Sequence, residues 1–285
     1  MTLAAYQLSF NGLTFGAGTD IQLVSATGLR ALPPARVADQ NRPRAHGAFA
    51  GLAYLGERTI TLQLLVSVTT SADWETVLQN LAAAFQPIPD PANLLALMVQ
   101  LPGWSFPVQV MCRPTRYEVP VNLAYSHHYA TVAVELIAPD PMWYGPTVTV
   151  TTTLPSPTSG APFPWSFPVS FGSSSGGSIS VANTGNAYTS PLFQIQGPCT
   201  NPWVQFASSR LTVDITLAST DALVLDSGAH TITLNGTASR YNDLQVGSQW
   251  FTCPPGTSTV RFGSGDSTAV AATCTAVWAS AYASI

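Results

Sequence analysis

The chain has 285 residues, of which 46% are hydrophobic and only 8% are charged, with a formal net charge of −4. This length accommodates two domains, and the high apolar fraction excludes a disordered chain. The acidic balance argues against a nucleic-acid-binding protein, and the lack of an apolar run of about 18 residues argues against a helical membrane protein.

All ten basic side chains are arginines, and the chain contains no lysine. Arginine suits packed, hydrogen-bonded interfaces better than the strongly hydrated ammonium of lysine. The first residues, MTLAAYQLSFNG, lack the basic start and apolar run of a signal peptide, so we expect synthesis in a cytoplasm. There we expect the four cysteines to stay as thiols. A disulfide within the second half stays open as an alternative. The four are Cys112, Cys199, Cys253 and Cys274.

Alternation of apolar and polar residues predicts several half-buried strands. It is clear over residues 59–68, 130–138 and 211–217. Two Asn-Gly pairs, at Asn11-Gly12 and Asn235-Gly236, predict tight hairpin turns because both residue types tolerate a positive φ. We therefore expect a mainly β protein.

One segment, residues 71–85, has helical spacing instead. Ser71 is the expected N-cap, Asp73 and Glu75 favour the positive end of the helix dipole, and Pro87 ends the helix. Its apolar stripe is expected to pack on a sheet. The stripe consists of Trp74, Val77, Leu78, Leu81 and Phe85.

Two stretches appear irregular. Residues 30–51 hold four of the ten arginines among prolines and read as a long loop, which in a compact domain is usually functional or disordered. Residues 153–177 are rich in Pro, Ser and Gly and read as a connection between domains. Four aromatic residues in the second stretch are expected to pack partly on a domain face, namely Phe163, Trp165, Phe167 and Phe171.

The sequence gives only weak matches to catalytic, metal-binding and phosphate-binding motifs. His127-His128 would point to opposite faces of a strand and so would not share a metal. The run 263–267, GSGDS, has the wrong spacing for a nucleophile elbow, and the Gly/Ser run 172–177 lacks the lysine of a P-loop. Asp221 and Asp226 lack the spacing of a calcium loop. We therefore predict no enzyme, and no catalytic, cofactor or metal site.

The order of several short features resembles one family. In the first half these are FNG at 10–12, RAHGA at 44–48, GERTI at 56–60 and APDPMWY at 138–144, with the single helix between the last two. In the second half they are NTG at 183–185, GSQW at 247–250 and VW at 277–278. Together they resemble the distal tail (Dit-like) proteins of long-tailed, non-contractile bacteriophages.

This resemblance implies an architecture and a role. It implies an N-terminal barrel- or sandwich-like β domain with one helix and a C-terminal galectin-like β-sandwich. The expected boundaries are 1–148 for a ring-forming, tube-continuing domain, 149–180 for the connection and 181–285 for the sandwich. It further implies a ring, usually of six copies, at the virion tail tip. The expected partners are the tail tube protein, the tail-tip hub protein and receptor-binding proteins.

The Arg-rich stretch is the expected interface. A closed ring needs two different, complementary patches on each subunit. We expect this stretch to reach a neighbouring subunit or a tail partner, and the alternative is a solvated loop with salt bridges inside its own domain. The candidate residues are Arg30, Arg36, Arg42, Arg44 and His46.

Two other functions compete with the ring. The second domain could be a carbohydrate-binding module that grips a host cell-wall saccharide through Trp203, Trp250 or Trp278. A tail-associated wall hydrolase is the enzymatic alternative, but its paired carboxylates cannot be identified in one sequence.

Overall fold

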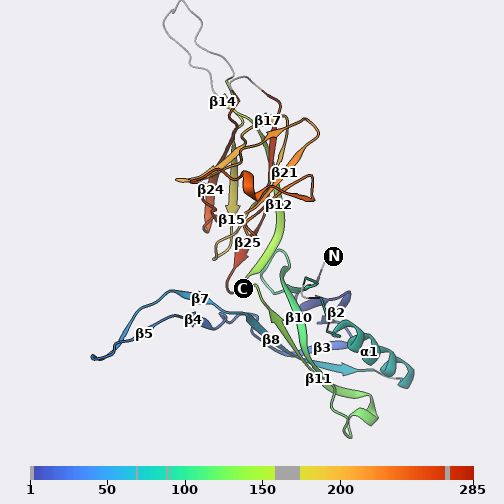
Figure 1. Cartoon of the computed structure of the whole chain (residues 1–285). Helices are drawn as coiled ribbons and strands as arrows, with labels where there is room; N and C mark the ends of the chain where they lie inside the picture. Colours follow the sequence, from blue (N-terminus) through green and yellow to red (C-terminus); the bar gives the residue numbers. More distant parts are fainter. Residues whose placement is uncertain (1–2, 69, 88, 91, 158–173, 267–269) are drawn as a thin grey trace, which may run out of the picture. The chain divides into compact units, whose positions relative to one another are not determined.

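The computed structural model describes residues 3–68, 70–87, 89–90, 92–157, 174–266 and 270–285. It divides into two compact units, unit 1 (Met1–Pro146 with Tyr282–Ile285) and unit 2 (Thr147–Ala281). Most of the described residues that form regular structure lie in strands, which confirms the mainly β fold (Figure 1). Along the chain, the units meet inside strand β12 (Trp143–Thr153) and near the end of strand β25 (Thr273–Tyr282).

Unit 1 is built from a bent antiparallel sheet, one helix and a projecting ribbon. The sheet strands are β1 (Gln7–Phe10), β2 (Leu13–Gly16), β3 (Ile21–Thr27), β8 (Arg58–Ser67), β9 (Leu95–Gln100), β10 (Val108–Glu118) and β11 (Tyr129–Ala138). The ribbon holds β4 (Ala35–Val37), β5 (Gln40–Asn41), β6 (Ala48–Phe49) and β7 (Ala53–Leu55). The helices are α1 (Ser71–Ala84) and the 3-10 helix η1 (Tyr125–His127).

The sheet of unit 1 turns a corner at β10. Its strand order is β2-β1-β9-β10-β11-β8-β3. The first part of β10 pairs with β9, and its second part pairs with β11 across an irregularity between Pro114 and Arg116. Such bulges bend a strand and let one sheet enclose a core. In β8 the predicted alternation is confirmed, because Ile60, Leu62 and Leu64 are fully buried.

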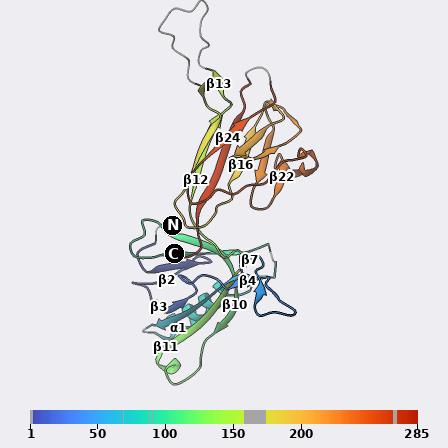
Figure 2. The same ribbon diagram turned by 90° about the vertical axis from the view of Figure 1, so that its left-hand side faces the viewer.

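Helix α1 covers part of this core, and both views show it lying beside the strands of unit 1 (Figures 1 and 2). Trp74 and Leu81 are buried, and Phe85 stacks on Phe10 with ring centroids 5.1 Å apart. The N-cap differs from the prediction by one residue. Thr70, rather than Ser71, has extended backbone angles and accepts a hydrogen bond from the Asp73 amide.

Unit 2 contains two facing sheets. One sheet follows the order β25-β16-β21-β22-β23, with β12 next to β25, and the other follows β15-β24-β18-β19. A buried apolar cluster fills the space between them. The remaining elements are β15 (Ser178–Asn183), β16 (Leu192–Gln196), β18 (Trp203–Phe206), β19 (Ser209–Thr212), β21 (Ala222–Asp226), β22 (Thr231–Leu234), β23 (Ala238–Ser239), β24 (Gly256–Gly263) and η2 (Tyr241–Asp243). Two small ladders pair β17 (Cys199–Thr200) with β20 (Thr216–Leu217) and β13 (Ser156–Pro157) with β14 (Ser174–Ser175).

Two local predictions were wrong. Residues 211–217 do not form one strand, because β19 ends at Thr212 and the chain then crosses to pair with β17. His127 and His128 do not lie on a strand. His127 ends η1, and His128 follows with a φ of 57°. The expected placement of the two histidines on opposite faces of a strand is therefore wrong.

Two turn predictions were right. Asn11 and Gly12 connect β1 to β2 with positive φ at both residues, and Asn235 and Gly236 do the same between β22 and β23. The predicted connection, residues 149–180, runs through the end of β12 and the start of β15, and its four aromatic residues lie outside the described residues. Among the described residues, no helix is long and apolar enough to cross a bilayer.

Candidate assembly surface

A two-stranded ribbon of unit 1 carries most of the predicted interface residues. We call residues 32–56 the arm. It pairs β4 with β7 near its base and β5 with β6 near its tip, and it extends away from the sheet strands of unit 1 (Figure 1). The long loop expected from the sequence is therefore a paired hairpin. Its base is closed by the hydrogen bond from the Gly56 amide to the Pro34 carbonyl, 2.7 Å long.

The middle of the arm depends on one glycine. The two ladders are separated by residues 38–39 on one side of the ribbon and by residues 50–52 on the other. The Gly51 amide donates to the Asp39 carboxylate at 2.8 Å, and the Ala38 amide donates to the Leu52 carbonyl. A Cβ at Gly51 would lie 2.1 Å from the Ala38 carbonyl oxygen, so only glycine fits this close approach.

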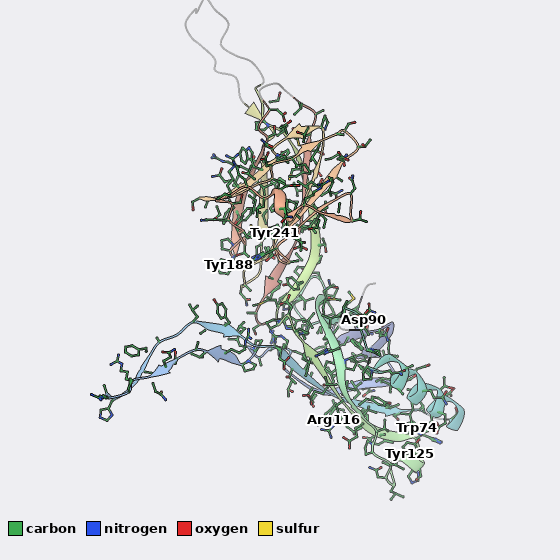
Figure 3. The ribbon with its side chains drawn as sticks, in the orientation of Figure 1. Trp74, Asp90, Arg116, Tyr125, Tyr188 and Tyr241 are labelled. Carbon is green, nitrogen blue, oxygen red and sulfur yellow. The ribbon has the colours of Figure 1, made fainter. Side chains whose placement is uncertain are left out.

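The arm has no buried face of its own. All residues from 34 to 54 are exposed. Figure 3 shows their side chains projecting from both sides of the ribbon. Large contiguous apolar patches exposed on proteins are associated with interaction sites, so this surface is a candidate for one. The large apolar residues are Leu32 (63% exposed), Val37 (54%), Phe49 (59%), Leu52 (70%) and Tyr54 (61%).

The structure brings four of the five predicted residues together on the arm. Arg36 lies in β4, and Arg42, Arg44 and His46 lie toward the tip. The Arg42 guanidinium carbon lies 5.1 Å from the centre of the Phe49 ring. Arg30 lies apart, at the root of the arm, where its Nε donates to the Ile285 carbonyl at 2.7 Å.

The arm is electropositive. Its sequence holds three arginines and one aspartate, which gives +2 in a chain of net charge −4. Within the described residues, the ion pairs are Arg116–Glu118 and Arg240–Asp243, and neither involves the arm. Among the described residues, the arm arginines thus form no salt bridge inside their own domain.

Sequence reasoning missed the apolar part of this surface. Phe49, Leu52 and Tyr54 were not singled out, yet each is more than half exposed. Their density among prolines and glycines was the available signal. Arg58 was also missed. It is 1% exposed, and its guanidinium donates to four backbone carbonyls.

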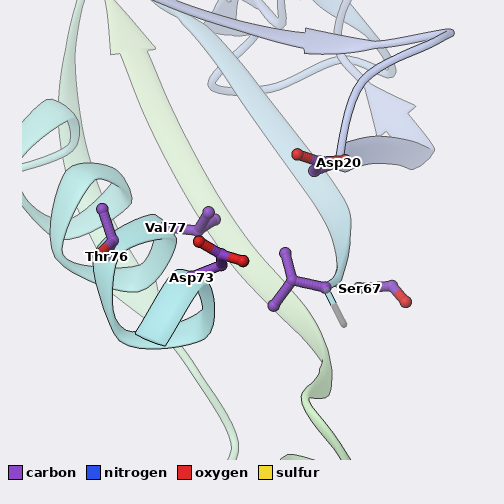
Figure 4. A pocket seen from close by; sticks show the side chains of 6 residues that line it. Asp20, Ser67, Asp73, Thr76 and Val77 are labelled. Carbon is purple, nitrogen blue, oxygen red and sulfur yellow. The ribbon is translucent and has the colours of Figure 1, made fainter. Parts of the chain in front are cut away.

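Two cavities lie in the described part of the chain. One cavity of about 250 Å³ lies beside the start of α1, and Figure 4 shows Asp20 and Asp73 on its walls. Another, of about 420 Å³, lies on the β18–β24 face of unit 2 and is lined by Gln205, Ala207, Thr259 and Arg261. Among the described residues, no three His, Cys, Asp or Glu side chains are grouped to hold a metal.

The three tryptophans considered for sugar stacking are already packed. Trp278 is 4% exposed, and its indole donates to the Ala182 carbonyl. Trp250 stacks on His230 with centroids 5.0 Å apart. Trp203 lies between the backbone of Gly263 and the guanidinium of Arg210, which is 4.1 Å from the ring centre. None of these three rings presents two open faces to a saccharide.

All four cysteines are buried free thiols. Burial raises the pKa of Cys112 and of Cys274 to about 12, and the pKa of Cys199 and of Cys253 to about 11. A reactive cysteine needs a lowered pKa and access to solvent. These thiols therefore serve as small apolar core groups.

Comparison with known proteins finds a tail family over the C-terminal part of the chain. Residues 184–282 match the family described as the siphovirus-type tail component, C-terminal domain. The chain is similar to Dit-type tail proteins. The crystal structure of the SPP1 Dit protein is similar over 96% of this chain and 98% of that chain, with a TM-score of 0.66 and 14% identity. That protein is described as a paradigm of the hub adsorption apparatus in phages that infect Gram-positive bacteria.

Two baseplate structures are more distant. Chains of the phage P2 baseplate, in its activated conformation with Ca, match at 8% identity and a TM-score of 0.46, over 91% of each chain. The same baseplate with Sr matches at 8% identity and 0.47, over 95% of this chain and 96% of that one. Both scores lie below 0.5, so the fold rests on the SPP1 likeness. No curated protein matches the sequence.

The Dit-like resemblance predicted from the sequence is thus confirmed, together with its mainly β fold. The family match supports a structural component of the phage tail, and hence a location in the virion tail. The matched proteins are structural tail proteins, and no catalytic family is among the matches reported above.

Proposed function

We propose that this Dit-like chain forms a closed ring, of six copies, that joins the phage tail tube to the tail-tip hub. The arm of each copy would contact the neighbouring copy. The observation that carries this proposal is an electropositive ribbon whose residues 34–54 are all exposed, with apolar side chains and no core of its own. Such a ribbon gains stability only when another surface covers it.

Ring closure requires two different patches on each subunit. The arm supplies one, on one side of unit 1, and helix α1 lies on the other side (Figure 1). A head-to-tail arrangement uses opposite sides of a subunit, so the position of the arm suits it. The domain assignment follows from this: residues 1–148 would form the ring and continue the tube, and 181–285 would project as the galectin-like sandwich.

The resemblance also suggests the neighbours. We propose the tail tube protein on one face of the ring and the hub protein on the other, with receptor-binding proteins held by the sandwich. The chain would be made in the host cytoplasm, where its buried thiols stay reduced.

The first test is the molar mass of the purified full chain by light scattering after size exclusion, with negative-stain images of the peak. We expect a closed ring with an open centre. If the chain is a monomer alone, the measurement is repeated with the tube and hub proteins. A chain that remains monomeric in the presence of both would contradict the proposal.

A triple variant tests the arm directly. Replacing Arg36, Arg42 and Arg44 with alanine should shift the ring toward monomers. The matched control replaces three exposed arginines outside the arm with alanine and should leave the ring intact. These are Arg113, Arg116 and Arg261. An intact ring in the arm variant would remove these arginines from the interface.

A pull-down on host cell walls separates the ring from the carbohydrate-binding alternative. A purely structural ring should stay in the supernatant. Binding that survives replacement of Arg261 and Gln205, which line the cavity on unit 2, would place a saccharide site elsewhere.

A further inference from the structure

The root of the arm forms hydrogen bonds with a segment that is distant in sequence. The root, residues 28–31, leads from β3 into the arm. Beside it lies the segment Tyr282–Ile285, which belongs to unit 1 although it follows the last strand of unit 2. Tyr282 and Ile285 are 8% and 6% exposed and belong to the unit 1 core. The Tyr282 ring packs edge-on against Trp104, with centroids 5.0 Å apart.

Arg58 joins the root to this segment. Its Nη1 donates to the carbonyls of Gly28 and Ala31, both at 2.7 Å, and its Nη2 donates to the carbonyl of Ala283 at 2.6 Å. Its Nε donates to the Pro141 carbonyl at 2.7 Å. One planar side chain thus holds three separate stretches of backbone in fixed positions.

The geometry depends on a guanidinium. Arginine has five N–H donors in a rigid fork, whereas lysine has one ammonium that cannot reach carbonyls on several sides. The guanidinium carbon also lies 5.6 Å from the centre of the Trp143 ring. Arg58 is not in either ion pair found in the described part of the chain, so a nearly fully buried cation is held there by carbonyl dipoles and an aromatic ring.

A second clamp lies on the outer side of the root. The Nε of Arg30 donates to the Ile285 carbonyl at 2.7 Å, and the Ser284 hydroxyl donates to the Arg30 carbonyl. The arm beyond these contacts has no buried residues between 34 and 54 that would fix its direction. Its direction therefore depends on the root.

We infer that Arg58 and Arg30 are positioning residues that hold the arm in one direction by clamping the segment Tyr282–Ile285 against its root. Withdrawal of that segment frees the arm. Because the segment continues β25 directly, displacement of the end of β25 along the chain reaches the arm through this clamp. The inference concerns the isolated protein and stands whether or not the arm meets a second copy.

The test measures the freedom of the arm by electron–electron distance spectroscopy. Spin labels are attached at His46→Cys near the tip and Thr131→Cys on β11, both exposed positions, in the full chain. The native cysteines are buried and react slowly, and the unsubstituted chain measures their background. In one variant the chain ends at Ala283, which removes the Ser284 and Ile285 contacts but leaves Tyr282 and Ala283 in place. The second variant is Arg58→Lys.

We expect the width of the distance distribution to at least double in both variants. The matched control, Arg113→Lys on the exposed face of β10, should leave the distribution unchanged, and so should Ser284→Thr, which keeps the hydroxyl. Trypsin digestion gives a second readout. Because the chain has no lysine, trypsin can cleave it only after arginines. Cleavage after Arg30 should accelerate about fivefold relative to cleavage after Arg44 in the truncated chain.

An unchanged distance distribution in the truncated chain would overturn the inference, whatever Arg58→Lys does to stability. If Arg58→Lys fails to fold, the truncated chain alone decides. A broadened distribution in Arg113→Lys as well would also overturn it, because the effect would then not depend on the clamp.

Discussion

Strand β8 and the arm lie next to each other in sequence and are both β-structure, but they are stabilised differently. In β8, alternate residues such as Leu62 and Leu64 are 0% exposed, and the strand is paired on both sides. In the arm, the ladders have three and two residue pairs, and Leu52 is 70% exposed. The strand supports the fold of unit 1, whereas the ribbon adds almost nothing to its core.

The largest expected effect comes from a matched pair of leucines. Leu62→Ala should lower the free energy of unfolding by about 2–5 kcal/mol, because it leaves a cavity in the core. Leu52→Ala should change it by less than about 0.5 kcal/mol, since its side chain is already in solvent. Urea denaturation of both variants measures the difference. A large loss in Leu52→Ala would show that the arm packs on its own unit.

Two glycines, one at the root and one in the arm, test the same comparison through the backbone. A Cβ at Gly28 would lie 2.0 Å from the Thr59 carbonyl oxygen, and one at Gly51 would lie 2.1 Å from that of Ala38. Gly28→Ala should destabilise unit 1 by about 1–3 kcal/mol, because its φ of 82° also adds strain. Gly51→Ala should leave the thermal midpoint unchanged and speed amide exchange in the arm. Equal midpoint shifts in the two variants would contradict the distinction.

The smallest expected effect concerns pH. Burial raises the pKa of Cys112 to about 12, above its value in the unfolded chain, so the thiol binds its proton more tightly when folded. Its contribution is fully present below the unfolded pKa and is lost as pH rises toward 12. From pH 8 to pH 10 the fall should be about 1 kcal/mol. Cys112→Ala should show a shallower fall, and deletion of the exposed arm should not alter the slope. Urea midpoints across this range measure it.

Much of the fold follows from local patterns in the sequence. The alternation in residues 59–68 and 130–138 and the two Asn-Gly turns appear as predicted, because each places a buried face or a positive φ where the structure needs one. Residues 211–217 were misread. The alternation continues past Thr212, but hydrogen bonding from Asn201 to the Ile215 carbonyl transfers the chain to another ladder. A change of the strand that a segment pairs with does not alter its alternation of apolar and polar residues.

The candidate surface was predicted only in part. Clustered arginines drew attention to residues 30–51, but a ribbon with no buried face has no alternation to reveal its strands. Arg58 was beyond sequence reasoning, because its four acceptors come from backbone at positions 28, 31, 141 and 283. Backbone carbonyls carry no residue-specific signal, so only the folded chain shows that they converge.

The short ladders of the arm bear on whether the chain aggregates after synthesis. A long, flat, apolar ribbon with free edges would recruit copies of itself into fibres before assembly. The break at Gly51, the prolines at 33, 34 and 43, and the charges of Arg36 and Arg44 interrupt any extended register. These interruptions oppose amyloid-like growth while leaving the exposed apolar side chains of the arm free for the contact proposed above.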